Sequence, residues 1–495
     1  MDWILGMLRP WELNVNISRE SGTSIHVQIA QKIIEEIQNG RFAPGVALPG
    51  TREFASKINV NRKTVVQAYD ELIAQGWLTS ENKRGTFVSS RFLTVNNTKL
   101  NCPSESQLNS TRLLTNATYS SLNKKQIHEF IHFSDGLSDT RLIPFESIAR
   151  AMRHALIVSA RNTKSAHSDP KGTLILREAI MHMLNMERGL HTNPDNICVV
   201  RGWQMGIFII SKVFIKTGDN VVVEQLSNPH ARDAFKNCGA NIISVPHDEN
   251  GIDVESLEEI CRQTKISVVY VTPHHQIPTT VTMSQSRRER LLKLADEYEF
   301  LIIEDDSNHE FNFSGASMLP IANMQKTKRV IYVGSLSKVL TSGLCVGYIV
   351  ASEDIIKTCA NRVMLIDSQG NQLIELAVAE LMHTGEIKKH ISRTVKVYSE
   401  RRALLSNLLQ NELNPYVNFQ QADTGLAFWL KLDSKINIEK LEHSAALQKV
   451  HFQSGNLFSS YGGQVNGIRM GFANLNYDET VQGVARLKRA FQNIQ

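Results

Sequence analysis

The first clear pattern of apolar positions along the chain begins near residue 24. In SIHVQIAQKIIEEIQNG, isoleucine stands at every fourth position, namely at Ile25, Ile29, Ile33 and Ile37. Residues four apart lie on the same face of an α-helix, so this spacing predicts one apolar stripe that faces a core. Gly40 follows the stripe, and glycine is the residue that most often ends a helix. The pattern therefore predicts a helix that ends before Gly40.

Two further helices and a hairpin follow in the same segment. PGTREFASKI predicts a short helix with Thr51 as its N-cap. NRKTVVQAYDELIAQG predicts a longer helix that is capped by Asn61 and carries its apolar side chains on one side. WLTSENKRGTFV predicts two short strands joined by a turn at 82–85. Helix, helix-turn-helix and hairpin in this order are typical of a winged helix-turn-helix domain, a small α+β fold.

Basic residues gather at particular points of this segment. Arg52, Arg62 and Lys63 stand at the starts of the second and third helices. Lys83 and Arg84 stand at the tip of the hairpin. Helix N-termini attract phosphate groups, and the start of a recognition helix is the part that reaches base edges. An ordinary solvated helix face also carries charges, but the order and spacing found here favour binding to double-stranded DNA.

Residues 91–125 show no sustained apolar periodicity. The stretch is rich in Ser, Asn and Thr, and it holds five Lys or Arg residues against one acidic residue. This composition predicts a polar flexible linker between folded domains. The expected boundaries are therefore 20–90 for the DNA-binding domain, 91–125 for the linker and 126–495 for a large second domain.

In this second domain, short apolar runs alternate with helical patterns. NVVVEQL, NIISVPH, KISVVYVTP, FLIIEDD and RVIYVGS are typical of buried strands, and SRRERLLKLADEYEF is typical of a helix. The alternation predicts a large α/β domain with a largely parallel sheet, and hence a multidomain protein. Ligands bind at the carboxyl ends of such strands, and Asp305, Lys338 and the turn 201–204 all fall at strand ends.

Composition narrows the class of protein further. A chain of 495 residues with 42% hydrophobic and 21% charged residues is long enough for two or three folded domains. We expect no signal peptide and no membrane contact, since no run approaches the roughly 18 apolar residues of a membrane helix. Six cysteines without metal-type spacing predict reduced thiols, no metal site and a cytoplasmic location. The net charge of +5 is modest, so the prediction of DNA binding rests on local clustering.

Several motifs resemble known families. LPGTREFASKINVNRKTVVQAYDELIAQGWLTSENKRGTFV resembles the winged helix of the GntR family of bacterial transcriptional regulators. DPKGTLILREAI, VYVTPHHQIPTTVTMSQSRRERLL, IIEDD, YVGSLSK and GIRMGFA jointly resemble the fold-type I aminotransferases, which depend on pyridoxal 5'-phosphate (PLP). This order on one chain resembles the MocR subfamily of GntR-type regulators. The resemblance implies a fold-type I PLP-dependent aminotransferase-like domain that binds an effector, and a homodimer.

The resemblance also implies a PLP site. Lys338 stands where relatives carry the lysine that bonds covalently to the cofactor, because only an amine condenses with its aldehyde. Asp305 matches the carboxylate that pairs with the pyridine nitrogen. Gly202 matches a turn that holds the phosphate at the start of a helix. Further candidate cofactor residues are Ser335, Ser337 and His275.

Two arginines are candidates for binding the carboxylate of an effector. Arg469 matches the arginine that clamps a substrate carboxylate with two parallel hydrogen bonds, and Arg232 is a second candidate. On the winged helix, the candidate DNA contacts are Arg52, Arg62, Lys63, Thr64, Tyr69, Lys83, Arg84 and Gly85.

Four positions depart from the pattern of relatives. Relatives carry a phosphate-binding arginine, a tyrosine after EDD, an aromatic residue that stacks on the cofactor, and a tyrosine from the neighbouring subunit. In their places stand, in that order, Cys345, Ser307, Asn228 and His167. A lost charge-assisted hydrogen bond to phosphate costs roughly 1.5–3 kcal/mol, so these changes predict weakened PLP binding.

Two residues beside Gly202 are candidates to compensate for these losses. Arg201 precedes the glycine and is a candidate to return the missing positive charge. Trp203 follows it and is a candidate to return a flat surface. A surface arginine and a core aromatic residue are equally good interpretations of the two positions.

Three functions remain as alternatives. The favoured one is a transcriptional regulator that binds PLP and senses a small amine or amino acid. The second is a regulator with a degenerate site that has lost PLP and senses another ligand. The third is an active PLP-dependent aminotransferase with an accessory DNA-binding head. Loss of the arginine and tyrosine argues against efficient turnover, so we expect residual transaminase activity at most.

Overall fold

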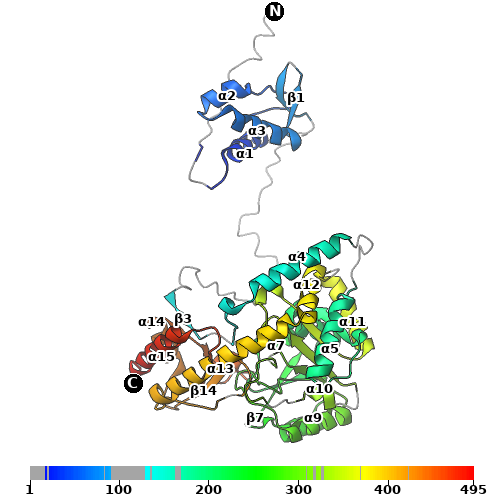
Figure 1. Ribbon diagram of the computed structural model, residues 1–495, viewed down its shortest axis with the longest axis vertical. Coiled ribbons are helices and arrows are strands. Elements are labelled where there is room, and N and C mark those ends of the chain that lie inside the picture. Colours follow the sequence, from blue (N-terminus) through cyan, green and yellow to red (C-terminus); the bar gives the residue numbers. More distant parts are fainter. Residues whose placement is uncertain are drawn as a thin grey trace, which may run out of the picture. The chain divides into compact units, whose positions relative to one another are not determined.

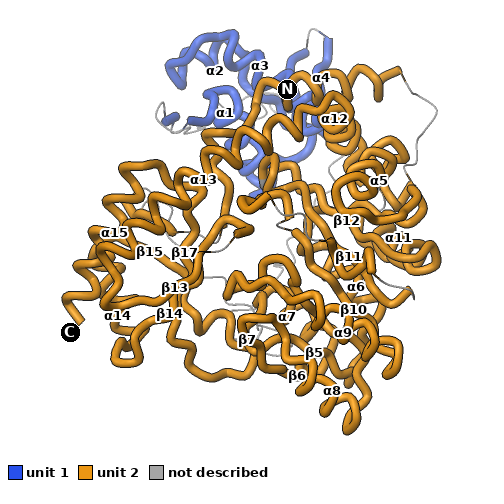
Figure 2. The backbone as a smooth tube through the Cα atoms, turned by 60° about the horizontal axis from the view of Figure 1, so that its bottom comes forward, with its two compact units in different colours: residues 1–120 blue, residues 121–495 orange. Residues whose placement is uncertain are grey.

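The computed structural model describes residues 17–18, 22–82, 84–90, 129–133, 136–161, 169–307, 309–315, 319–324, 328–367, 370–421 and 423–494. The chain forms two compact units, residues 1–120 and 121–495, which are described separately (Figure 2). The predicted linker and two predicted site residues, Lys83 and His167, lie outside the described residues. The domain boundaries derived from the sequence stay a prediction.

The first unit contains three helices and a hairpin, as the apolar pattern predicts. These elements are α1 (Ile25–Gln38), α2 (Thr51–Lys57), α3 (Arg62–Ala74), β1 (Leu78–Glu81) and β2 (Gly85–Val88). Ile29 and Ile33 of the predicted stripe are fully buried, together with Phe54, Val65 and Leu72 from the other two helices. One small core therefore holds the three helices and the hairpin together.

The helix caps of this unit follow the sequence closely. Asn61 caps α3, since its side chain accepts a hydrogen bond from the backbone N–H of Lys63 at 2.9 Å. This bond satisfies one of the orphan donors at the helix start and confirms the predicted cap. For α2 the prediction was wrong by one residue, because Gly50 is the N-cap and Thr51 is the first helical residue.

The second unit is built on a seven-stranded sheet with the strand order β4-β12-β11-β10-β9-β5-β6. Its strands are β4 (Ile197–Val200), β5 (Asn220–Glu224), β6 (Asn241–Val245), β9 (Val268–Val271), β10 (Leu301–Asp305), β11 (Val330–Ser335) and β12 (Gly347–Val350). Strand β12 runs antiparallel to both neighbours, while β11, β10, β9, β5 and β6 pair in parallel. The predicted, largely parallel sheet is confirmed.

Helices cover both faces of this sheet (Figure 1). On one face lie α6 (Gly202–Phe214), α7 (Pro229–Lys236) and α11 (Glu353–Asp367). On the other lie α8 (Val254–Gln263), α9 (Gln285–Tyr298) and α10 (Ile321–Met324). The remaining helices of this part are α4 (Phe145–Arg161), α5 (Leu174–Glu187) and α12 (Gln372–His383). Burial on both faces explains why the strands are continuously apolar instead of alternating.

A smaller four-stranded sheet, with the order β13-β14-β17-β16, was not predicted from the sequence. Its strands are β13 (Val417–Phe419), β14 (Ala427–Leu432), β16 (Gln453–Ser454) and β17 (Gly467–Gly471). The helices of this part are α13 (Glu386–Glu412), α14 (Ile438–Leu447) and α15 (Tyr477–Gln492). Short elements complete the unit: β3 (Ile131–His132), β7 (His247–Asp248), β8 (Gly251–Ile252), β15 (Val450–His451) and single turns of 3-10 helix.

Candidate functional site

Asp305 ends strand β10 in the interior of the large unit. Its Oδ2 accepts a hydrogen bond from the hydroxyl of Tyr270 at 2.7 Å, and its Oδ1 accepts one from the backbone N–H of Ser307 at 3.1 Å. Burial raises the pKa of Asp305, while these two bonds and the charge of Lys338 act in the opposite direction. Asp305 is therefore a buried carboxylate whose charged form is supported by three neighbours.

Lys338 follows the end of β11, the strand beside β10, and its side chain is partly buried. Its backbone carbonyl accepts a hydrogen bond from the hydroxyl of Ser138. The hydroxyl of Ser337 accepts from the N–H of Val346 at 3.1 Å, and the hydroxyl of Ser335 accepts from the N–H of Ser337 at 3.2 Å. These bonds fix the turn that carries the lysine. The two serine hydroxyls thus have partners within the fold.

Two glycines allow strand β12 to approach the start of α6 closely. Gly202 has a φ of +78°, a conformation that favours glycine. A Cβ on Gly347 of β12 would lie 2.6 Å from the carbonyl carbon of Gly202, so that position also requires glycine. The first N–H groups of a helix lack partners within it and attract anions. The start of α6 therefore has the form that a phosphate-binding turn needs.

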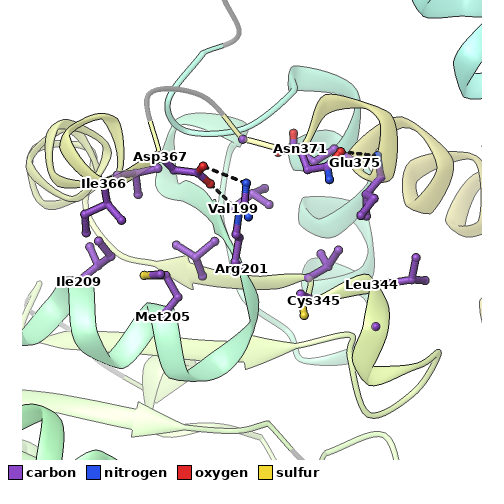
Figure 3. Close-up of a pocket in the computed structure, with 16 residues that line it drawn as sticks. Val199, Arg201, Met205, Ile209, Leu344, Cys345, Ile366, Asp367, Asn371 and Glu375 are labelled. Carbon is purple, nitrogen blue, oxygen red and sulfur yellow. Dashed lines mark hydrogen bonds and ion pairs between the residues drawn. The ribbon is translucent and has the colours of Figure 1, made fainter. Parts of the chain in front are cut away.

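Arg201 immediately precedes α6 and forms an ion pair with Asp367, the last residue of α11. Its Nε lies 2.5 Å from one carboxylate oxygen, and its Nη2 donates to the other at 2.8 Å (Figure 3). The side chain of Arg201 is 55% exposed and that of Asp367 is 25% exposed. Arg201 thus has a carboxylate partner within the fold, and its role at the phosphate end of the site stays a prediction.

Cys345 lines the same pocket as this ion pair, which has a volume of about 250 Å³ (Figure 3). The cysteine is exposed and has a φ of +47°, a left-handed conformation that is uncommon for residues other than glycine. A thiol carries no positive charge at neutral pH, so Cys345 does not replace the arginine that relatives carry.

Arg469 of β17 and His275, which follows β9, form a buried pair. Nη2 of Arg469 lies 3.3 Å from Nε2 of His275, and Nη1 donates to the backbone carbonyl of Pro278 at 2.7 Å. A Cβ on Gly425 would collide with the ring of His275, so the backbone lies directly against this ring. The structure thus brings two predicted site residues together from segments 194 residues apart.

Arg232 of α7 is also buried, and its guanidinium N–H groups form hydrogen bonds with the backbone. Its guanidinium donates to the backbone carbonyls of Ser227 at 2.8 Å, Phe458 at 2.6 Å and Leu457 at 2.9 Å. These bonds hold the 457–458 turn against α7. A role for Arg232 as a second carboxylate clamp stays a prediction, and it would require some of these carbonyls to be released.

Two other predicted positions also have local structural partners. Asn228 is the N-cap of α7, and its side chain accepts from the N–H of His230 at 3.0 Å. Trp203 is partly buried and packs against the apolar cluster between α6 and the sheet. This packing agrees with a core aromatic residue, and a role for the ring as a flat surface for the cofactor stays a prediction.

Beside Asp305, the structure contains a buried ion network that the sequence reasoning missed. Asp306 accepts hydrogen bonds from Arg188 Nη2 at 2.6 Å and from the hydroxyl of Tyr332 at 2.7 Å. Its other oxygen lies 2.8 Å from Nδ1 of His274. Burial alone would raise the pKa of Asp306, but the charges of His274 and Arg188 lower it below the ordinary value. The second aspartate of EDD was the only local signal of this network.

On the first unit, the predicted DNA contacts at the helix starts are exposed. Arg52, Arg62 and Lys63 face solvent, and Thr64 is partly buried. At the hairpin, Gly85 is exposed with a φ of +124°, and Arg84 pairs with Glu81 at 2.9 Å. An open groove on α3 is lined by Arg62, Lys63, Val66, Gln67 and Asp70. The last three follow Arg62 and Lys63 at helical spacing, so periodicity could have identified them.

Tyr69 lies in the core of the first unit, which corrects its assignment as a DNA contact. Only 2% of the residue is exposed, and its hydroxyl donates to the backbone carbonyl of Pro49 at 3.0 Å. Its ring packs near that of Phe54, with 6.1 Å between the centroids. The side chain therefore stabilises the domain from inside. Its position on the inner side of α3 follows from the stripe that also buries Val65 and Leu72.

Comparisons with known proteins agree on both units. Residues 25–88 match the bacterial regulatory proteins of the gntR family, and residues 130–487 match the class I and II aminotransferases. The probable rhizopine catabolism regulatory protein MocR of Rhizobium meliloti is 26% identical over 486 residues, covering 96% of this chain and 95% of MocR. The HTH-type transcriptional regulator YdeL of Bacillus subtilis (strain 168) is 26% identical over 477 residues, covering 96% and 98%.

Solved aminotransferase structures resemble the large unit. The kynurenine aminotransferase of Pyrococcus horikoshii has a TM-score of 0.69 and 29% identity, covering 74% of this chain and 91% of the enzyme. LysN, the α-aminoadipate aminotransferase of Thermus thermophilus, was solved with N-(5'-phosphopyridoxyl)-L-leucine. It has a TM-score of 0.69 and 26% identity, covering 75% and 94%.

A winged helix-turn-helix domain joined to a fold-type I aminotransferase-like α/β domain defines a transcriptional regulator that binds DNA. The chain belongs to the MocR-type subfamily of gntR-family regulators, with an aminotransferase class I and II domain as its larger part. The fold class predicted from the sequence is confirmed. Among the helices that the structure describes, none is long and apolar enough to cross a membrane.

Proposed function

We propose that this regulator binds PLP at Lys338 and uses it to sense a small amine or amino acid. The observation that carries the proposal is the buried Asp305 at the end of β10, supported in its charged form by Tyr270, Ser307 and the charge of Lys338. When bound, PLP supplies an aldehyde that reacts with amines and a protonated ring that withdraws electrons.

The residues fit the ring end of PLP well. Asp305 would accept the proton-bearing ring nitrogen as a hydrogen-bond partner, and Lys338 would hold the cofactor covalently. At the phosphate end, the N–H groups after Gly202 would bind the phosphate. Arg201 borders this turn but pairs with Asp367, so we expect a weaker hold on the phosphate than an unpaired arginine would give.

Arg469 is the candidate residue for the carboxylate of an amino-acid effector. It is buried beside His275, where its charge is little screened by solvent. An effector held at Arg469 would place its amine in competition with that of Lys338. Such a ligand alters DNA binding only to the extent that it binds one domain arrangement better than the other.

We also propose that the regulator is a homodimer. Apolar side chains are exposed at the end of α11, where Leu365 is 73% exposed beside Met364 and Ile366, and on α4, at Phe145 and Leu156. Exposed apolar patches of this kind mark interaction surfaces. A twofold pairing of copies would present two winged helices to two half-sites on DNA.

A second candidate function is a regulator that has lost PLP and senses another ligand. Cys345 in place of an arginine and the pairing of Arg201 with Asp367 favour it, because both reduce the positive charge offered to a phosphate. Residual transaminase activity is compatible with the first candidate and not with the second.

The test of the cofactor is spectroscopic. The purified protein is mixed with PLP, reduced with borohydride and digested for peptide mass mapping. A visible absorption band together with an adduct on Lys338 supports PLP binding. Absence of both directs the search to another ligand of the same site.

A further inference from the structure

We propose that Asp367 is a built-in competitor for the phosphate group of the ligand at the start of α6. By holding Arg201, its carboxylate sets how tightly a phosphate binds there. This inference rests on the proposed function and adds a residue that regulates affinity at the same site.

The geometry of the ion pair is that of an arginine bound to a phosphate. Arginine binds carboxylates and phosphates in the same way, through two parallel N–H donors. In this chain the edge formed by Nε and Nη2 of Arg201 is bound to both oxygens of Asp367. The backbone of Arg201 is the N-cap of α6, so the guanidinium belongs to the residue that begins the anion-binding turn. A phosphate at that turn and Asp367 therefore compete for one donor edge.

The charges around the pocket leave no substitute for Arg201. Among the described residues that line it, Arg201 is the only one with a positive charge, whereas Asp367 and Glu375 are acidic. Cys345, which also lines it, offers no positive charge. Release from Asp367 would therefore free the one cation among the described residues of this pocket for a phosphate at the start of α6, the helix that Arg201 precedes.

Within one copy of the chain, the ion pair is also exposed enough to exchange. With Arg201 more than half exposed, solvent screens the pair, and such pairs contribute little to stability. A phosphate carries more charge than a carboxylate and also receives the N–H groups of the helix start. Asp367 therefore lowers the affinity for the phosphate without abolishing it, and its removal strengthens binding.

The experiment compares Asp367→Asn with the unchanged protein in two titrations, one with PLP and one with pyridoxal, which lacks the phosphate. The variant is expected to bind PLP about fivefold more tightly, which is the upper range for an exposed ion pair, and to bind pyridoxal unchanged. Asp354→Asn is the matched control, because it removes the same charge from the first turn of α11 at a residue whose side chain is 94% exposed. In the double variant with Arg201→Ala, the gain is expected to disappear.

The inference would be overturned if Asp367→Asn bound PLP no more tightly than the unchanged protein. It would also be overturned if the variant gained as much affinity for pyridoxal as for PLP, or if the gain for PLP persisted in the double variant that lacks Arg201. If no protein binds PLP and no adduct forms on Lys338, the proposed cofactor fails separately. In that case, thermal unfolding in the presence of inorganic phosphate tests whether Asp367 competes with phosphate. Stabilisation by phosphate that is greater in Asp367→Asn supports competition, and equal stabilisation refutes it.

Discussion

Tyr270 donates a hydrogen bond of 2.7 Å to Asp305 across two neighbouring parallel strands, β9 and β10, and both residues are buried. The donor supports the charged form of the carboxylate that we assign to the ring nitrogen of PLP. The electrostatics of the candidate site are therefore set in part by a residue one strand away.

Tyr270→Phe is expected to shift the pH dependence of PLP binding. Without this donor, the pKa of Asp305, already raised by burial, rises further. The carboxylate then becomes protonated at a higher pH, so PLP binding should be lost at a higher pH as the solution is acidified. Absorbance titrations over a pH series measure this midpoint. Tyr477→Phe, which removes an exposed hydroxyl, is the control. Identical midpoints for Tyr270→Phe and the unchanged protein would refute the prediction.

Arg62→Ala is expected to weaken binding to the operator by about 1–3 kcal/mol and to flatten its salt dependence by about one unit of slope. The reason is that Arg62 is exposed at the start of α3, the predicted recognition helix. Fluorescence anisotropy at several salt concentrations measures both quantities. Lys32→Ala, which removes a cation of α1 paired with Glu35, should leave both nearly unchanged. Lys338→Ala should also leave binding without effector intact. If operator binding survived deletion of residues 1–90, the winged helix could not be the DNA-binding domain.

Tyr69→Phe is expected to give the opposite pattern to Arg62→Ala. The lost hydrogen bond to Pro49 should lower the free energy of unfolding by about 0.5–1.5 kcal/mol. Operator affinity should stay the same, because the side chain is buried in the domain core. Calorimetry and anisotropy on the same preparation distinguish the two effects. A strong loss of affinity in a stably folded variant would restore Tyr69 as a DNA contact.

Arg188→Met is expected to destabilise the large domain by roughly 3–5 kcal/mol, because it removes the arginine that pairs with the buried carboxylate of Asp306. Arg201→Ala provides the contrast, since its ion pair with Asp367 is partly exposed and should contribute about 1 kcal/mol or less. Denaturant unfolding of both variants measures the difference. Equal losses would mean that the network around Asp306 contributes no more than a surface ion pair.

Glu224→Gln is expected to remove a pH dependence of stability. Burial raises the pKa of Glu224 to about 8, although Gln276 donates to it at 3.1 Å. The folded protein therefore holds this proton more tightly than the unfolded chain does. The resulting stability is complete below the ordinary pKa of a glutamate and is lost as the pH rises through about 8, at up to about 1.4 kcal/mol per pH unit.

Unfolding free energies across this pH range should fall less steeply in Glu224→Gln than in the unchanged protein. Glutamine retains an oxygen that accepts from Gln276, so the local hydrogen bond persists. Glu249→Gln, at an exposed position in the 247–252 turn, is the control. Parallel pH profiles of the unfolding free energy for all three proteins would contradict a raised pKa of Glu224.

Much of the architecture could be predicted from the sequence because its signals are local. The isoleucine stripe of α1, the cap at Asn61 and the apolar runs of the parallel strands each depend on residues a few positions apart. The sequence also predicted that Asp305 and Lys338 fall at strand ends, and the structure shows that they follow neighbouring strands. The apolar run of a buried strand and the turn residues after it can be recognised from the sequence without knowledge of what packs around them.

The pairing of side chains was decided only by the tertiary structure. Arg201 meets Asp367 across 166 residues, and Arg188 meets Asp306 across 118. Periodicity shows which side of an element is apolar, but not which charged groups of distant elements end within hydrogen-bonding distance. The sequence by itself therefore determined the domains, the parallel sheet and the residues at its strand ends. The packing of α11 against α6 determined that Arg201 is held by a carboxylate, because that contact depends on how two distant helices pack.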